Sequence, residues 1–404
     1  MKQGAAGLPV VAPNGALARV FLSFLATAGL FYVNIMPAII DGIIASLGFS
    51  TEQAGFVGSA NVYGAAIGAL AIVFLVPRVR WRPAAYALLV CLVGMDTLSM
   101  LATAPAVMIG ARFVHGLAGG ALVGVAFSVI ARTVAPDRTF GVLLVVQFGL
   151  GGLGNLYLPR LVPRFGEDVL FLSLIAFSVV TLAMLPFLDR YPTAAPNRTD
   201  AAGPGGRGGA VLPIALVFLA IFLFQAANMG LFAFIIGLGR EAGLTLELIT
   251  FVLAVSAWVG ILGALVVIVL YTRYGRALPL SVAMALTIAG FLALHHAEVQ
   301  GLFLAANCAT GITWAFVIAY LLGLAAEFDR TGQMAALGGF ASKMGLASGP
   351  LAAGMLLGDG GRYALLINLG AVALVLSLLA CLPPAIRQDR RAKAPPLAAE
   401  APGS

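Results

Sequence analysis

Charged residues are scarce in this chain of 404 residues. Asp, Glu, Lys and Arg together make up 10% of the sequence, whereas a soluble domain carries roughly 25%. So few charges cannot cover a water-facing surface, which excludes a soluble α/β protein. The net charge of +7 is spread over the gaps between apolar segments, which is the pattern of a membrane protein and not of a nucleic-acid-binding patch.

Reactive groups are equally sparse. The three cysteines, Cys91, Cys308 and Cys381, all fall within apolar segments and indicate no disulfide framework. No group of His, Cys, Asp and Glu has metal-ligand spacing, and no Ser or Cys nucleophile has a base nearby. We therefore expect neither a metal site nor a cofactor, and we do not expect an enzyme.

Long apolar stretches are what the sequence has in abundance, because 61% of its residues are hydrophobic. Each stretch is about 18 to 27 residues long, enough to cross a hydrocarbon core of roughly 30 Å as a helix. The sequence therefore predicts an all-α membrane protein with about twelve transmembrane helices. The first set spans 17–40, 52–76, 84–103, 106–131, 139–159 and 168–188, and the second spans 211–237, 246–270, 277–294, 299–325, 332–357 and 363–383.

The segment 189–210 between the two sets is polar and rich in Pro and Gly, which predicts a flexible linker. It divides the chain into an N-terminal six-helix bundle at 1–188 and a C-terminal six-helix bundle at 211–386. Residues 387–404 are expected to form a disordered cytoplasmic tail.

Orientation follows from the basic residues between the spans. With the N-terminus inside, only Arg160, Arg164, Arg240 and Arg362 fall on the outer side, and the other basic residues outside the spans fall on the inner side. This asymmetry predicts that the linker and both termini are cytoplasmic. The first apolar stretch is too long for a cleavable signal peptide. Arginine in large excess over lysine, with abundant Ala and Gly, suggests a GC-rich bacterial genome and therefore the bacterial inner membrane.

The two sets of spans resemble copies of each other. Residues 48–52 match 243–247, Gly68–Leu70 match Gly263–Leu265, and Asp137–Thr139 match Asp329–Thr331. Six helices repeated in the same orientation form a parallel repeat, an architecture of secondary transporters in which substrate binds near the midplane between the halves.

Several motifs resemble those of the major facilitator superfamily, and the likeness extends over essentially the full length. They are the stretch Leu47–Leu70, in which Ser50 and Gln53 form a candidate capping box, the fourth-span segment Arg112–Gly120, and the Gly-Pro segment Gly345–Gly354 in the eleventh span. The resemblance implies the major facilitator fold and a monomeric transporter in the lipid bilayer that works by alternating access. The superfamily's Asp-Arg-x-Gly-Arg loop reads Pro77–Trp81 and Thr272–Arg276 here. Both copies lack the Asp to which the superfamily's inner gating clasp is attributed.

Two basic residues lie inside predicted spans, Lys343 and Arg112. A charged side chain at the centre of a membrane helix costs about 2.5–3.5 kcal/mol. Lys343 therefore predicts a cavity, a carboxylate or an anionic substrate, although a structural Lys bonded to backbone carbonyls is an alternative. Arg112 has the same two interpretations, substrate charge balance or a structural tie between helices.

The candidate proton-coupling residues are His115 and Asp96. His115 lies one helical turn beyond Arg112 on the same face and can titrate near neutral pH, although it can equally be a packing residue. Asp96 is the clearest acidic residue inside a span. In the fold that the sequence resembles, its helix is peripheral, which favours a structural partner.

Polar residues also gather in spans that the resemblance places around the cavity, namely the first, fourth, seventh and tenth. Amides bond helices together as well, so each residue alone is a weak indication. The candidate substrate-binding residues are Arg112, Lys343, Asn34, Tyr32, Gln225, Asn228, Asn307 and Trp314, with Thr310 on the same stripe.

Two buried cations against few buried acids favour transport of a small organic anion, expected to be a carboxylate, together with protons. The alternative is a proton-coupled multidrug or metabolite efflux transporter. That function would favour an acidic residue in the cavity, and only Asp96 and Asp41 are available. A receptor would keep the two-half architecture without flux, and an intramembrane enzyme would need a catalytic cluster that the sequence lacks.

Overall fold

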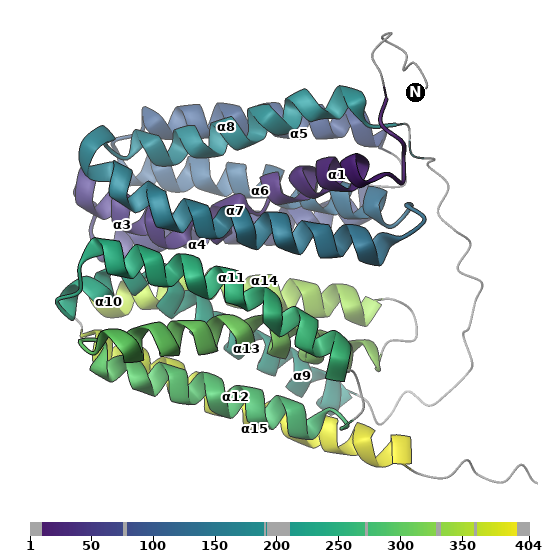
Figure 1. The fold of residues 1–404 in the computed structure, drawn as a ribbon, viewed down its shortest axis with the longest axis vertical. Coiled ribbons are helices and arrows are strands. Elements are labelled where there is room, and N and C mark those ends of the chain that lie inside the picture. The colour runs from purple at the N-terminus through teal and green to yellow at the C-terminus, as the bar shows by residue number, and fades with distance from the viewer. Residues whose placement is uncertain are drawn as a thin grey trace, which may run out of the picture.

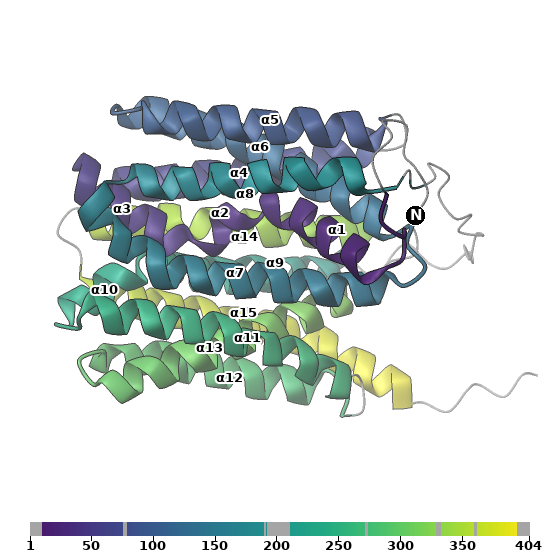
Figure 2. The ribbon, with the colours of Figure 1, turned by 45° about the horizontal axis from the view of Figure 1, so that its top comes forward.

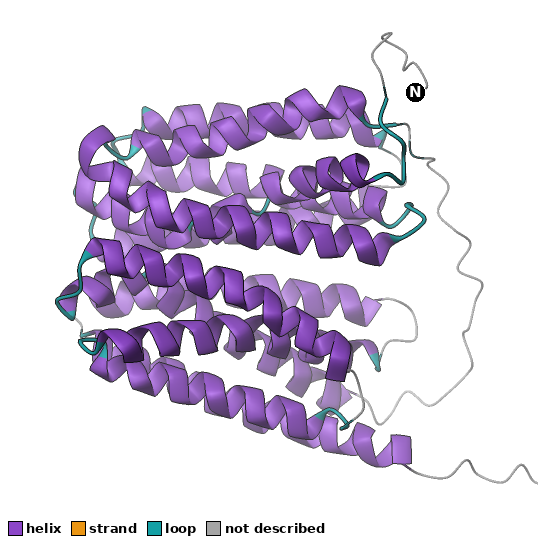
Figure 3. Ribbon diagram, in the orientation of Figure 1, coloured by secondary structure: helices purple, strands orange, loops and turns teal. Residues whose placement is uncertain are grey.

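The computed structural model describes residues 10–75, 79–189, 191, 211–270, 274–328, 333–358 and 362–393. These residues form fifteen α-helices that run side by side along one direction (Figures 1 and 3). In the first half they are α1 (Ala16–Ala28), α2 (Phe31–Asn34), α3 (Met36–Leu47), α4 (Thr51–Leu75), α5 (Trp81–Met100), α6 (Pro105–Ile130), α7 (Pro136–Phe165) and α8 (Asp168–Met184), extended by a 3-10 turn. In the second half they are α9 (Val211–Ala233), α10 (Ile235–Glu241), α11 (Leu246–Leu270), α12 (Ala277–Ala293) with a 3-10 turn, α13 (Gln300–Ala326), α14 (Gln333–Gly358) and α15 (Tyr363–Lys393).

The predicted set of crossings is present. Among the described residues, ten helices are long and apolar enough to cross a membrane. The broken series α1–α3 and the helix α14 supply two further crossings, so the described chain makes twelve. The two halves lie against each other in both views (Figures 1 and 2). We call the end where α1 begins the N-terminal face and the opposite end the distal face.

The first and seventh crossings are each broken, which the sequence did not predict for spans 17–40 and 211–237. The backbone leaves the helical region at Ile35 (φ −106°, ψ 17°) and at Phe234 (φ −110°, ψ 14°), so the two halves break with nearly the same angles. Pro37 lies in the first turn of α3, where its missing N–H costs nothing. Past the breaks, these crossings extend to Leu47 and Glu241.

The predicted capping box at the start of α4 is confirmed. The backbone N–H of Ser50 donates to Gln53 Oε1 at 3.0 Å, and the N–H of Gln53 donates to Ser50 Oγ at 3.1 Å. Two backbone donors that the helix cannot satisfy itself are thereby paired.

Glycines allow close contact between the backbones of adjacent helices, as expected for membrane helices. A Cβ added at Gly116 of α6 would collide with the backbone carbonyl of Asn61 on α4. On α7, Cβ atoms added at Gly152 and Gly154 would collide with Trp258 and Ile35. Gly152 and Gly154 of α7 therefore serve packing.

The start of the helix that follows each loop lacking the superfamily Asp is bonded to the C-terminal end of its own half. In the first half, Arg82 donates to the carbonyl of Leu188 at 2.6 Å, and also to two carbonyls just before it. In the second half, the carboxylate of Asp389 accepts from the backbone N–H groups of Arg276 and Ala277, at 2.8 and 2.9 Å. The start of α5 thus supplies a guanidinium to backbone carbonyls, and the start of α12 supplies backbone N–H groups to a carboxylate.

The ends of the chain depart from the predicted boundaries. Helix α15 runs past the predicted end at 383 to Lys393, so the expected tail at 387–404 begins as helix, and residues 394–404 lie outside the described part. Of the expected linker, only Asp189 and Tyr191 are described. Burial, helped by the charge of Asp189, raises the pKa of Tyr191 to about 12. Its hydroxyl therefore stays protonated and donates to the carbonyl of Pro13 at 2.7 Å.

Candidate functional site

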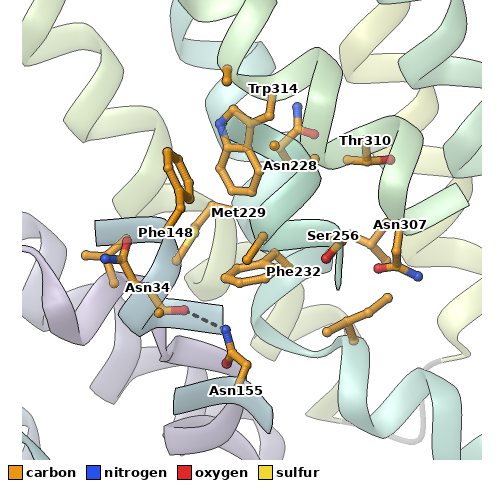
Figure 4. A pocket seen from close by; sticks show the side chains of 18 of the residues that line it. Asn34, Phe148, Asn155, Asn228, Met229, Phe232, Ser256, Asn307, Thr310 and Trp314 are labelled. Carbon is orange, nitrogen blue, oxygen red and sulfur yellow. Dashed lines mark hydrogen bonds between the residues drawn. The ribbon is translucent and has the colours of Figure 1, made fainter. Parts of the chain in front are cut away.

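A cavity of about 300 Å³ lies between the two halves (Figure 4), at the lower end of the roughly 300–1,000 Å³ found for small-molecule sites. The first half lines it through α2 and α7, and the second half through α9, α10, α11, α12, α13 and α14. Its position between two repeats is where a transporter of this architecture holds substrate.

A chain of hydrogen bonds fixes the aromatic wall of the cavity. The indole N–H of Trp314 on α13 donates to Gln225 Oε1 on α9 at 2.6 Å, and Gln225 Nε2 donates to Ser342 Oγ on α14 at 2.7 Å. The indole also meets the ring of Phe232 edge-on, with centroids 5.8 Å apart and planes at 82°. Three helices are therefore locked together around one flat apolar surface.

The break after α2 exposes a backbone carbonyl that α7 uses. Asn155 Nδ2 donates to the carbonyl oxygen of Asn34 at 2.9 Å (Figure 4). The Asn34 side chain is bound in turn by Gln147, whose Nε2 donates to Asn34 Oδ1 at 3.2 Å and whose backbone oxygen accepts from Asn34 Nδ2 at 3.4 Å. The amides of α2 and α7 thus hold the broken crossing at the edge of the cavity.

Five of the eight predicted substrate-binding residues line this cavity, namely Asn34, Gln225, Asn228, Asn307 and Trp314. Sequence reasoning missed Gln147, Asn155 and Ser256 on α7 and α11. A signal was present, because Gln147, Gly151 and Asn155 recur every four residues on one helix face. The resemblance directs attention to the first, fourth, seventh and tenth crossings, so this stripe on the fifth crossing was not considered.

No charged side chain is among the described residues that line the cavity, and none of those residues belongs to α6. Arg112 of α6 is instead fully buried within the first half. Its Nη1 lies 2.8 Å from Asp96 Oδ1 on α5, and its Nη2 donates to Ser99 Oγ and to the carbonyl of Met95. Arg112 and Asp96 therefore tie two helices together, which is the structural alternative considered for both residues.

His115 belongs to the same buried cluster. Asn61 Nδ2 donates to the carbonyl oxygen of Arg112 at 3.2 Å and lies 2.8 Å from His115 Nδ1. A carbonyl can only accept, so the amide nitrogen must face it, and His115 Nδ1 must be an acceptor. The imidazole is then neutral, with its hydrogen on Nε2, 3.4 Å from Asp96 Oδ1.

Tyr32 completes the cluster and does not line the cavity. Its ring centroid lies 5.7 Å from the Arg112 guanidinium carbon and 5.8 Å from the His115 ring. The sequence-predicted Tyr32, Asp96, Arg112 and His115 are thus brought together, but in the core of the first half.

Lys343 lies apart from that cluster, half-buried on α14. It is one helical turn from Leu346, which lines the cavity, and residues three apart on a helix share a face. Side chains lean toward the start of their own helix, so the ammonium lies on the N-terminal-face side of Leu346. Within the described part of the chain, Lys343 has neither an ion pair nor a hydrogen bond.

Hydrogen bonds join the two halves at the distal face. Asp41 of α3 accepts from both terminal nitrogens of Arg240 on α10, at 2.6 and 3.0 Å. Arg160 of α7 donates to Thr250 Oγ1 at 2.7 Å and to the carbonyl of Glu247 at 2.8 Å, both on α11. These contacts hold the two halves together on that side, and we call Asp41–Arg240 the distal latch.

Two further bonds between the halves lie near mid-height. The Trp258 indole on α11 donates to the carbonyl of Gly149 on α7 at 3.2 Å. The hydroxyls of Tyr63 on α4 and Ser348 on α14 are 2.8 Å apart. The halves are therefore bonded from the middle of the crossings to the distal face.

Comparisons with known proteins give one family. The model of the Major Facilitator Superfamily matches residues 20–328 of the chain. No curated protein is a detectable sequence relative.

Solved structures share the fold at low sequence identity. The nucleoside transporter NupG is 12% identical with a TM-score of 0.69, over 91% of this chain and 98% of that one. A bacterial homologue of the human lysosomal transporter Spinster, in an inward-facing and unoccupied conformation, is 14% identical with a TM-score of 0.67, over 96% of this chain and 100% of that one.

Proposed function

The chain belongs to the major facilitator superfamily, and we propose that it moves a small organic anion, a carboxylate, across the bacterial inner membrane by alternating access. The cavity between the halves is the substrate site, and it would open to one side of the membrane at a time. The carboxylate meets Lys343, and the rest of the molecule contacts the uncharged cavity wall.

The proposal rests on which charged side chains inside the crossings have a partner of opposite charge. The charge of Arg112 is compensated by Asp96 at 2.8 Å, whereas Lys343 has no described partner on any helix. An uncompensated cation in a membrane helix costs about 2.5–3.5 kcal/mol, and an anionic substrate would offset that cost. Lys343 is therefore the anchor, and Arg112 is withdrawn from that role.

A neutral polar solute is the second candidate, because the described lining of the cavity carries amides, hydroxyls and aromatic rings but no charge. The alternative of multidrug or metabolite efflux has less support. An acidic side chain that could bind a cationic drug is absent from the same lining.

Proton coupling is proposed to act through Asp96 and His115, with Arg112 and Tyr32 as the groups that face them. In this conformation Asn61 holds His115 neutral, so proton uptake on the imidazole requires the Asn61 amide to turn. Asp96 faces the imidazole through Oδ1, 3.4 Å from His115 Nε2, and its Oδ2 is buried without a partner.

The N-terminal face is proposed to be cytoplasmic, because basic residues gather there. The helix ends and loops of that face carry Arg19, Arg80, Arg82, Arg132, Arg138, Arg276, Arg387 and Arg390, against Arg160, Arg164, Arg240 and Arg362 at the distal face. One chain encloses the whole described cavity, so a monomer is sufficient for transport.

Uptake by purified protein in liposomes separates the two candidates. Gluconate and sorbitol are six-carbon polyols that differ by one carboxylate. Saturable uptake of labelled gluconate that exceeds sorbitol uptake is expected. Equal uptake of gluconate and sorbitol would show that the substrate is a neutral polar solute and not an anion.

A further inference from the structure

Three asparagines of the cavity share one arrangement. Asn228 and Asn307 each donate through Nδ2 to the backbone carbonyl four residues earlier, Phe224 and Phe303, both at 2.8 Å. Asn155 donates through Nδ2 to the carbonyl of Asn34 at 2.9 Å. In each case the nitrogen end of the amide is bound by the protein.

These bonds fix which end of each amide is free. A backbone carbonyl can only accept, so the amide nitrogen must face it and the oxygen must face away. Asn155 and Asn228 are both 1% exposed, and the Oδ1 atom of each is buried with no partner. Such an unsatisfied oxygen is destabilising and calls for a functional explanation.

Other donors around the cavity are also bound by the protein. The Trp314 indole donates to Gln225, and Gln147 Nε2 donates to Asn34. The hydroxyl of Ser256 donates to the carbonyl of Leu253 at 2.9 Å. Each of these donors thus has a partner within the protein, whereas the amide oxygens of Asn155 and Asn228 have none.

We infer that the cavity recognises its substrate through hydrogen-bond donors carried by the substrate, received by the amide oxygens of Asn155 and Asn228. Combined with the anchor at Lys343, this narrows the substrate class to hydroxylated organic acids. The inference rests on the proposed function only in taking this cavity as the substrate site. It does not depend on the substrate being an anion.

Calorimetric titration of the purified protein with three six-carbon probes tests charge and donors separately. Gluconate carries a carboxylate and hydroxyls, hexanoate carries only the carboxylate, and sorbitol carries only hydroxyls. Gluconate is expected to bind at least tenfold more tightly than hexanoate, because hexanoate leaves the amide oxygens unpaired.

The outcomes distinguish the two proposals. Equal affinity for gluconate and hexanoate, or no binding of either hydroxylated probe, would overturn the donor inference. Equal affinity for gluconate and sorbitol would support it and overturn the anionic substrate instead.

Substitution of Asn155 and Asn228 tests whether their amide oxygens are the groups that bind the hydroxyls of the substrate. Asn228→Leu and Asn155→Leu keep the side-chain size and remove the acceptor, so each should weaken gluconate binding by roughly tenfold and leave any hexanoate binding unchanged. Asn368→Leu is the matched control, because Asn368 bonds His295 at the distal end of α15, outside the cavity lining. If either cavity variant melts like the wild type and binds gluconate as tightly, that oxygen is not a substrate ligand.

Discussion

Arg112 and Asp96 form an ion pair of 2.8 Å in which neither side chain is exposed to solvent. The pair joins α6 to α5 inside the first half, and Ser99 and Met95 take further bonds from the same guanidinium. The two charges compensate each other inside the first half, so neither is available to a substrate in the cavity. Lys343, by contrast, has no described partner.

Breaking the Arg112–Asp96 pair by substitution should lower the stability of the protein, and any loss of substrate binding should be secondary. Arg112→Gln or Asp96→Asn leaves one buried charge without its partner, which should cost about 3–5 kcal/mol and lower the melting temperature in detergent. The double variant should lose less than the sum of the two. Arg240→Gln, at a half-exposed site, is the control with a small effect. If the Arg112→Gln protein melts like the wild type but no longer binds gluconate, Arg112 is a substrate-binding residue and not a structural one.

The sequence predicted the crossings, the capping box at Ser50 and five residues of the cavity, because these depend on hydropathy, local spacing and a single helix face. It did not predict that Arg112 would meet Asp96. That contact depends on how α5 and α6 rotate against each other, which packing of glycines and side chains decides. The roles of Asn155 and Gln147 were missed for the same reason, since a polar stripe looks alike whether it faces a helix or a cavity.

The distal latch should hold the cavity closed on that side. In a protein with Cys91, Cys308 and Cys381 replaced by Ala, a cysteine at Val33 reports access to the cavity lining. Asp41→Asn removes the negative charge and one of the two oxygens that accept from Arg240. It should therefore speed labelling of this cysteine from outside by an impermeant thiol reagent.

The control for that experiment is Glu327→Gln, which breaks the ion pair of Arg276 with Glu327 at the N-terminal face. It should not change labelling from outside. If Asp41→Asn leaves the labelling rate unchanged as well, the Asp41–Arg240 bond does not hold the distal face closed.

Coupling through His115 predicts a pH dependence. Proton uptake on the His115 imidazole is favoured at low pH, so gluconate affinity should weaken as the pH rises, over a range in which gluconate stays fully ionised. His115→Gln should flatten this dependence and preserve exchange of substrate between the two sides. The measurement is uptake into liposomes with imposed pH gradients. Identical profiles for both proteins would assign His115 to packing alone.

Topology is open to a direct test with two introduced cysteines in the cysteine-free background. Gly205→Cys lies in the expected linker, beyond the described residues, and should be labelled only when the inner face is exposed. Glu298→Cys lies between α12 and α13 at the distal face and should be labelled in intact cells. The reversed pattern would invert the orientation.

The most direct test of the anion proposal is uptake of labelled gluconate by Lys343→Gln protein in liposomes, with protein content and melting temperature matched to the wild type. Removing the Lys343 charge, which has no described partner, should abolish uptake. Lys343→Arg should keep at most a fraction of it, because a guanidinium is wider and flatter than an ammonium. Undiminished gluconate uptake by the Gln variant would contradict the account and show that Lys343 does not hold the substrate.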